Sequence, residues 1–146
     1  MVNLSDFAIR STTYRKEYFE KHKPEKRNKY RCAYCGYLYP KSQITIDHIR
    51  SVHSAKKSFF LRMYLKMRGY KSINDLRNLV PACEKCNKKK GAKGGFWICK
   101  GILGRHKSYW IIRRLLFICI IIATIYLICK THIYTNIYEF VKGGVK

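Results

Sequence analysis

An aspartate and a histidine lie side by side at the end of a short alternating run, Ile44-Thr-Ile-Asp47-His48-Ile49. β-branched residues at every second position, with polar residues between them, predict a half-buried strand. Neighbouring side chains of a strand point to opposite faces, so Asp47 and His48 serve one site only if the strand bends there. A carboxylate can hold a hard cation, and a neutral imidazole can accept a proton from water near pH 7. Together these groups are suited to metal-assisted hydrolysis.

Two cysteine pairs flank this strand, Cys32-Ala-Tyr-Cys35 and Cys83-Glu-Lys-Cys86. Two residues between cysteines allow one tight turn to aim both sulfurs at a single point, as tetrahedral zinc requires. The two pairs therefore predict a structural zinc ion with four cysteine ligands. Two disulfides, or a redox pair, are the alternatives. The start of the sequence lacks a signal-peptide pattern, which disfavours disulfides, and a redox motif does not explain two copies.

With Asn78-Leu-Val before the second cysteine pair and Asn87 directly after it, residues 30–91 resemble the zinc-containing HNH endonucleases. The resemblance covers under half of the chain and implies a ββα-metal fold braced by the four-cysteine zinc. It implies that His48 is the general base and that Asn78 fixes the loop. It further implies that Asp47 and Asn87 bind a catalytic Mg²⁺ or Mn²⁺. The reaction implied is hydrolysis of a phosphodiester bond in DNA, giving a 5′-phosphate and a 3′-hydroxyl; RNA is not excluded as a substrate.

The segment between His48 and Asn78 is longer than the compact family pattern and lacks its usual Pro and Gly-Gly. Its centre, residues 55–68, carries apolar residues at helical spacing, and Gly69 is suited to end a helix there. We predict that the apolar stripe of this inserted helix packs into the core and that its basic side faces solvent or DNA. The stripe consists of Phe59, Phe60, Met63, Tyr64 and Met67.

The chain carries 31 Lys and Arg against 8 Asp and Glu, a net charge of +23. This excess indicates a polyanionic partner, either nucleic acid or anionic lipid. Close to the Asp-His pair and the second cysteine pair, four basic residues are predicted to contact phosphates: Arg50, Lys88, Lys89 and Lys90. The competing function is a non-catalytic zinc module that binds nucleic acid or anionic lipid through its basic surface. The sequence gives no indication of an oligomeric state.

Residues 111–129 form a stretch of 19 residues that is apolar except for Arg113, Arg114 and Thr124. About 20 apolar residues are needed to cross a bilayer, so this stretch predicts a transmembrane helix if both arginines extend to the headgroups. A buried core helix is the alternative. Residues 1–110 hold 26 Lys and Arg and residues 130–146 hold three. The positive-inside rule therefore predicts a single-pass protein of the cytoplasmic membrane whose zinc module faces the cytoplasm.

The predicted fold class is α+β, a small ββα-metal zinc module with flanking helices and a C-terminal transmembrane helix. Ser11–His22 is predicted as a short basic helix ended by Pro24. In chain order, the predicted parts are 1–29 (basic N-terminal helix and linker), 30–95 (HNH module with inserted helix 55–68), 96–110 (basic and aromatic connector), 111–129 (transmembrane helix) and 130–146 (short tail).

Overall fold

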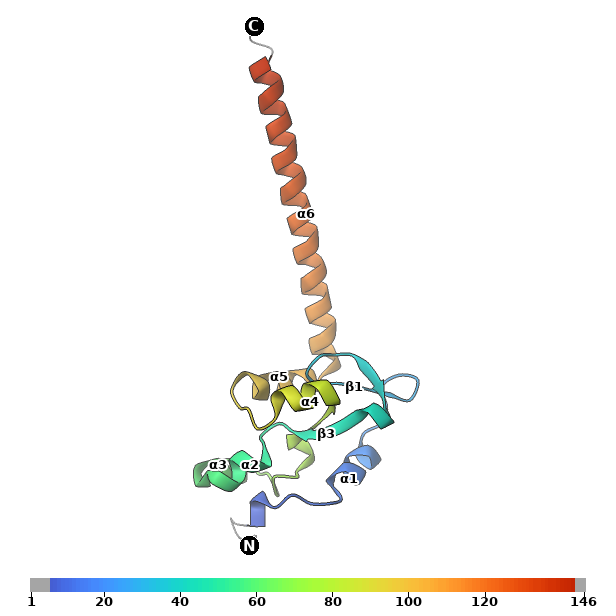
Figure 1. Cartoon of the computed structure of the whole chain (residues 1–146), viewed down its shortest axis with the longest axis vertical. Helices are drawn as coiled ribbons and strands as arrows, with labels where there is room; N and C mark the ends of the chain where they lie inside the picture. The colour runs from blue at the N-terminus through green and yellow to red at the C-terminus, as the bar shows by residue number, and fades with distance from the viewer. Residues whose placement is uncertain (1–5, 144–146) are drawn as a thin grey trace. The chain divides into compact units, whose positions relative to one another are not determined.

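A computed structural model describes residues 6–143, with the backbone alone for 137–139 and 141–143. The first five residues of the predicted N-terminal part and the last three of the predicted tail lie outside the described residues. The chain divides into two compact units, residues 1–107 and 108–146. The first unit mixes short strands and helices and the second is one long helix (Figure 1). The mixed α+β class expected from the sequence is therefore confirmed.

Two two-stranded antiparallel sheets form the frame of the first unit. Strand β1 (Lys29–Arg31) pairs with β2 (Leu38–Pro40), and β3 (Ile44–His48) pairs with β4 (Leu79–Cys83). Helix α4 (Glu84–Lys90) follows β4 directly, so β3, β4 and α4 form a strand–strand–helix unit. Strand β3 alternates between buried and half-buried residues, as its sequence predicts.

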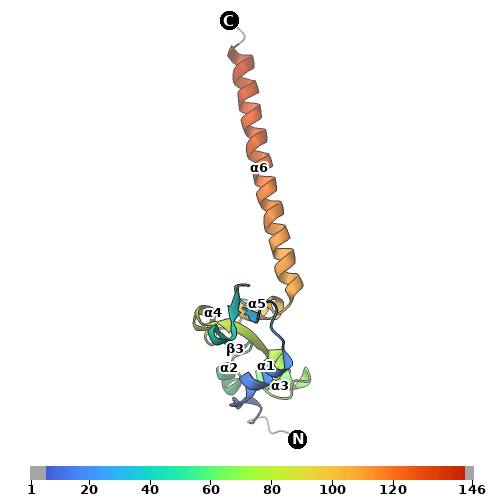
Figure 2. The same ribbon diagram turned by 90° about the vertical axis from the view of Figure 1, so that its right-hand side faces the viewer.

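Two helices from distant parts of the chain complete the main core around β3 and β4. Helix α1 (Tyr14–Lys21) buries two tyrosines against the sheet, and α5 (Phe96–Gly104) forms within the predicted connector and packs Trp97 and Ile98 on the same core. Figures 1 and 2 show β3 between α1 on one side and α4 on the other. Short 3₁₀ turns cover Asp6–Ala8 (η1), Lys41–Gln43 (η2) and Leu76–Asn78 (η3).

The inserted segment forms two helices rather than one. Helix α2 (Val52–Lys57) ends at Ser58, whose side chain accepts a hydrogen bond from Leu61 N and so begins α3 (Phe59–Met67). A small second core lies beneath them, made of Phe7, Ala8, Ala55, Leu65 and Ile73.

The prediction that the apolar stripe of this insertion packs into the core is wrong. Its five residues are between 39% and 81% exposed, from Met63 to Met67. The inward face of α3 is formed instead by Leu65, which is fully buried, and Leu61, which is partly buried. Nearly every residue of α3 is apolar, so hydrophobic spacing alone did not identify the buried side.

Helix α6 (Lys107–Gly143) forms the second unit. Within Lys107–Asn136 of this helix, the most apolar window of 18 residues has a mean hydropathy of 2.4, and none of that window is buried. By length and composition this helix could cross a membrane. The buried core helix that competed with this interpretation is therefore not what the described residues form. The helix begins before the predicted residue 111 and continues through most of the predicted tail.

Gly104, the last residue of α5, allows that helix to lie directly against the first cysteine turn. A Cβ atom at this position would come within 1.8 Å of the carbonyl oxygen of Ala33, which is backbone and cannot move aside. We therefore expect Gly104→Ala to lower the free energy of unfolding by about 3 kcal/mol, the upper end of the usual cost of overpacking, measured by urea denaturation. Gly94→Ala is the matched control, because a Cβ there meets only a side-chain methyl at 3.7 Å. Equal stability of the two variants would contradict this packing.

Candidate metal centre and histidine site

The four cysteines of the two predicted pairs come together at one point. Their Sγ atoms all lie within 4.8 Å of one another. Cys32 and Cys35 flank the turn between β1 and β2, where Gly36 takes a positive φ of 80° and donates its N–H to the Cys32 carbonyl at 2.9 Å. Cys83 ends β4, and Cys86 lies in the first turn of α4. This cluster could bind a metal such as zinc, which prefers four sulfur ligands in a closed site.

The four thiols are available as metal ligands, because none of them is held in a disulfide. All seven cysteines of the chain are free of disulfides. Burial raises the pKa of the Cys32 thiol to about 11, so the free thiol stays protonated near neutral pH. A divalent cation supplies the positive charge that stabilises thiolates at such a position.

His48 lies at the end of β3 in a nearly closed environment. Its side chain is only 5% exposed, and the Tyr14 ring of α1 lies over it with the ring centroids 4.9 Å apart. Burial lowers the pKa of the imidazole, which keeps the ring neutral near pH 7. A neutral ring carries one N–H and one lone pair, so its chemistry depends on which nitrogen holds the proton.

Asn74 determines that proton position. Its Oδ1 lies 3.1 Å from His48 Nε2 and also accepts the Ser11 N–H at 3.2 Å, while its Nδ2 donates to the Ile9 carbonyl at 2.7 Å. The two backbone contacts fix the orientation of the amide, and Oδ1 can only accept. His48 therefore carries its proton on Nε2, and the lone pair lies on Nδ1. Sequence reasoning missed Asn74, since 26 residues separate it from His48.

Asn78 joins the loop that follows β3 to its surroundings through hydrogen bonds. It is 2% exposed, and its Oδ1 accepts the Arg50 N–H at 2.9 Å. Its Nδ2 donates to the carbonyls of Arg50 and Ile73 at 3.1 and 2.8 Å. One side chain thus joins the exit of β3 to the segment that enters β4.

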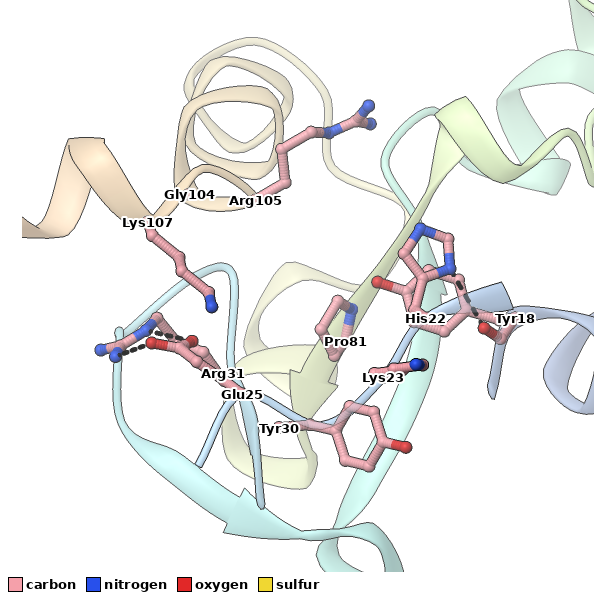
Figure 3. Close-up of a pocket in the computed structure, with 10 residues that line it drawn as sticks. All are labelled: Tyr18, His22, Lys23, Glu25, Tyr30, Arg31, Pro81, Gly104, Arg105 and Lys107. Atoms are coloured by element: carbon pink, nitrogen blue, oxygen red, sulfur yellow. Dashed lines mark hydrogen bonds and ion pairs between the residues drawn. The ribbon is translucent and has the colours of Figure 1, made fainter. Parts of the chain in front are cut away.

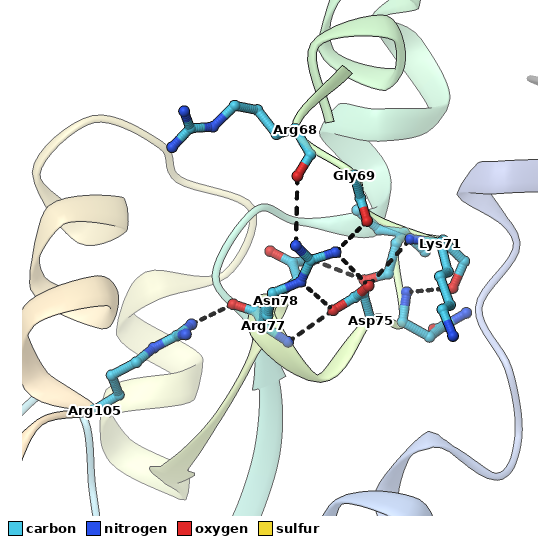
Figure 4. A network of polar contacts seen from close by, with 10 residues as sticks. Arg68, Gly69, Lys71, Asp75, Arg77, Asn78 and Arg105 are labelled. Atoms are coloured by element: carbon cyan, nitrogen blue, oxygen red, sulfur yellow. Dashed lines mark hydrogen bonds and ion pairs between the residues drawn. The ribbon is translucent and has the colours of Figure 1, made fainter. Parts of the chain in front are cut away.

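A second polar network holds the same entering segment (Figure 4). Arg77 pairs with Asp75 at 2.9 Å and donates to the Arg68 and Gly69 carbonyls. The hydrogen bonds from Arg77 lower the pKa of the Asp75 carboxyl to about 2. Arg105 in turn donates to the carbonyl of Arg77. These contacts fix the polypeptide on both sides of Asn74.

Asp47 makes contacts on the opposite face of β3 from His48. Its Oδ2 accepts the Tyr34 hydroxyl at 2.6 Å and lies 2.9 Å from the Lys90 ammonium. The strand remains extended through His48, which pairs with Leu79, so the bend needed to bring both side chains to one site is absent here. Burial raises the pKa of the Tyr34 hydroxyl, and the nearby Asp47 carboxylate raises it further.

The prediction that Lys90 contacts phosphates on the surface is wrong for this structure. It is fully buried, and besides the Asp47 pair its Nζ donates to the His48 carbonyl at 2.8 Å. Lys88 and Lys89 are exposed on the same helix, with Lys88 paired to Glu84 at 2.6 Å. The last turn of α4 thus directs one of three consecutive lysines into the protein.

The remaining predicted residues lie near this pair. Arg50 is half-exposed, with its guanidinium 5.0 Å from the centroid of the Tyr64 ring. Asn87 is half-buried and lies one turn before Lys90 on α4. Residues three apart on a helix share a face, so the helix side that contacts Asp47 also carries Asn87.

The possible metal ligands beside Lys90 fit a hard cation only in part. Asp47 and Asn87 offer oxygen atoms, the ligands that Mg²⁺ and Mn²⁺ prefer. Oδ2 of Asp47 is already occupied by Tyr34 and Lys90, so its Oδ1 is the atom left for an ion. Lys90 already supplies one positive charge to this carboxylate.

A separate cavity of about 200 Å³ lies between the end of α1, strand β1 and the residues after α5 (Figure 3). On its wall the Tyr18 and His22 rings stack with their centroids 4.1 Å apart, and Arg31 is ion-paired with Glu25. None of the residues that line it belongs to the predicted site. This cavity therefore does not carry the predicted chemistry.

Comparison with protein-family models, with curated proteins and with solved structures finds no match to this chain.

The four-cysteine cluster predicts one zinc ion per chain, measurable by mass spectrometry of the purified full-length protein. Cys83→Ser is expected to lose the metal and the cooperative unfolding transition, because three remaining thiols no longer close a tetrahedral site. Cys99→Ser is the matched control, since Cys99 is exposed and outside the cluster. Full zinc content in Cys83→Ser would exclude this ligand set.

The contacts of His48 predict the Nε2–H tautomer and a pKa below the ordinary histidine value, both measurable by nitrogen-correlated NMR. In the unfolded chain the His48 ring takes up its second proton, which makes it an imidazolium, more readily than in the folded chain. The stability due to neutral His48 is therefore complete above about pH 6.5 and decreases as pH falls toward the folded pKa. Asn74→Ala removes the acceptor and should populate both tautomers, whereas Asn87→Ala should not. An Nδ1–H tautomer in the wild type would contradict the assignment.

Proposed function

We propose that this chain is a metal-dependent endonuclease of the HNH type, which hydrolyses phosphodiester bonds in DNA and is held at a membrane by α6. The observation that carries the proposal is the state of His48. It ends the first strand of a strand–strand–helix unit, burial keeps its ring neutral, and Asn74 leaves the Nδ1 lone pair as a base. A general base of this kind accelerates hydrolysis by about 10²- to 10⁴-fold.

In the proposed mechanism His48 accepts a proton at Nδ1 from the attacking water. The resulting imidazolium keeps its Nε2–H bonded to Asn74 Oδ1, so the ring does not have to reorient during the step. Asn78 holds the backbone after His48 through two hydrogen bonds with Arg50 and ties it to the carbonyl of Ile73 through a third. Asp47 and Asn87 would hold the Mg²⁺ or Mn²⁺ ion, which neutralises charge on the scissile phosphate when bound.

Catalysis by His48 requires a rearrangement at the N-terminal segment. Tyr14 covers the ring, and Ile9 and Ser11 are attached to Asn74 by hydrogen bonds. Because the His48 side chain is only 5% exposed, we infer that a phosphate reaches its ring only after neighbouring groups such as Tyr14 move. In the active complex the end of β3 also has to turn, because Asp47 and His48 now face opposite sides. We infer that binding of DNA supplies the energy for both changes.

The net charge of +23 supports a nucleic-acid substrate. Lys88 and Lys89 are exposed on α4, the helix whose last turn contacts Asp47 through Lys90, and in the proposed complex they contact phosphates of the substrate. RNA offers the same phosphates, so the two substrates differ only in contacts to sugar and base.

Membrane attachment is proposed from the composition of α6. The helix is long and apolar enough to span a bilayer once. With most Lys and Arg before it, the positive-inside rule places the nuclease module on the cytoplasmic side of the cytoplasmic membrane. DNA entering or leaving the cell passes that surface.

A non-catalytic module that binds nucleic acid or anionic lipid is the second candidate. It is favoured by the burial of His48 and by the pairing of Asp47 with Lys90, which commit both groups to internal contacts. Such a binder tolerates alanine at His48 and keeps a steep salt dependence of binding.

The nuclease proposal predicts that full-length protein in detergent nicks supercoiled plasmid DNA when Mn²⁺ or Mg²⁺ is added. His48→Ala should lower the rate by at least about 10²-fold, because the general base is lost. His53→Ala, which changes an exposed histidine five residues away, should retain the rate. Equal rates in wild type and His48→Ala would disprove the role of His48. No nicking of DNA or RNA by folded, zinc-loaded protein would favour the binding module.

A further inference from the structure

Helix α3 presents an apolar face that is largely exposed in the described part of the chain, with the Arg50 guanidinium over its Tyr64 ring. Five side chains on successive turns are exposed on it, among them Phe60 at 74% and Met67 at 81%. The whole set is Phe59, Phe60, Met63, Tyr64 and Met67, which we call the α3 face. Large contiguous apolar surfaces are uncommon on soluble domains and mark sites of interaction.

The α3 face is preformed rather than a loosely held segment. On the other side of the helix, Leu65 and Leu61 pack on Ala55 and the rest of the second core. Ser51 and Ser58 cap α2 and α3 through their side-chain oxygens. Arg62 donates to the Ala55 and Lys56 carbonyls at 2.7 and 2.9 Å, which holds the end of α2 against α3. Docking therefore requires little ordering of the chain.

The inserted segment that forms α2 and α3 carries charge of a single sign along the chain. Between Asp47 and Asp75 the chain contains no acidic residue. Four basic side chains of the two helices are exposed there: Lys56, Lys57, Lys66 and Arg68. An apolar face bordered by Lys and Arg is the pattern of helices that lie in the headgroup region of anionic bilayers.

We propose that the α3 face docks on an anionic lipid surface, with Phe60 and Met67 inserted among the acyl chains and the basic residues at the headgroups. The proposal rests on α6 spanning the same membrane, which keeps the module close to the bilayer at a high effective concentration.

Charge and chemistry favour a lipid surface over the other two occupants. A second copy docked through the same face would bring seven Lys and Arg of residues 48–74 against an identical set, with no acidic residue of that segment to pair with them. DNA would pair with these charges, but phosphates and sugars offer little apolar surface to Phe60 and Met67. Only a bilayer presents anionic groups above a continuous apolar layer.

The test places the photo-crosslinker p-benzoylphenylalanine at position 60 of the full-length chain, reconstituted in liposomes of mixed anionic and zwitterionic phospholipid. The control carries it at position 37, where Tyr37 is similarly exposed at 71% on the first cysteine turn. We expect lipid adducts when the crosslinker is at position 60 and none when it is at position 37. In purely zwitterionic liposomes the adducts at position 60 should fall, as should those of the double variant Lys56→Glu, Lys57→Glu.

Each other outcome overturns the proposal. Equal lipid adducts at both positions, no adduct at position 60, or an adduct to a second chain or to added DNA in place of lipid would contradict docking of the α3 face. A chain that does not stay with the liposomes would exclude both the span and the docking. The assay does not require DNA cleavage, so an inactive protein that yields the lipid adduct leaves the docking surface in place. Zinc content of each variant confirms that it is folded.

Discussion

The ion pair between Lys90 and Asp47 determines how the strand–strand–helix unit is assembled. The ammonium has no exposure to solvent, and it joins the Asp47 carboxylate and the His48 carbonyl to the last turn of α4. A buried charge is costly unless it is paired, so removal of either partner leaves an uncompensated charge in the interior. At its other end α4 begins inside the four-cysteine cluster. The helix is therefore fixed to β3 by charge at one end and to the first cysteine turn by the thiol cluster at the other.

The features that could be predicted from the sequence are those that the spacing of neighbouring residues specifies. The cysteine pairs, the alternating strand and the apolar C-terminal helix are visible within a few residues each, and all three are present. The burial of Lys90 was not predictable, because Lys88, Lys89 and Lys90 are identical in type and only the rotation of α4 relative to β3 distinguishes them. Asn74 was missed for the same reason, since its partner lies on another element. The buried side of α3 was assigned incorrectly because Leu61 and Leu65 compete with five other apolar residues.

The faces of β3 separate the two groups that hydrolysis would combine. His48 faces α1 and Asn74, while Asp47 faces α4 and Tyr34. An extended strand enforces this separation through its two-residue period. A proton acceptor and a cation-binding carboxylate held apart in this way form a resting arrangement, in which each is occupied by an internal partner. In the proposed nuclease, the N-terminal segment is the element that has to move, because it covers His48 without being part of the core hairpin.

The proposed partners of this chain are both anionic, so net charge alone does not decide between them. Attraction of the basic surface to DNA or to lipid headgroups is screened by salt over about 10 Å. Insertion of apolar side chains into a bilayer is not screened in this way, and its strength follows the apolar area buried. The α3 face adds this apolar contribution to the binding of lipid only, and not to the binding of DNA. Lys88 and Lys89 lie outside that face and contribute charge without an apolar surface of their own. If both proposals hold, the two partners would depend on different residues, and the protein would be able to hold membrane and nucleic acid at the same time.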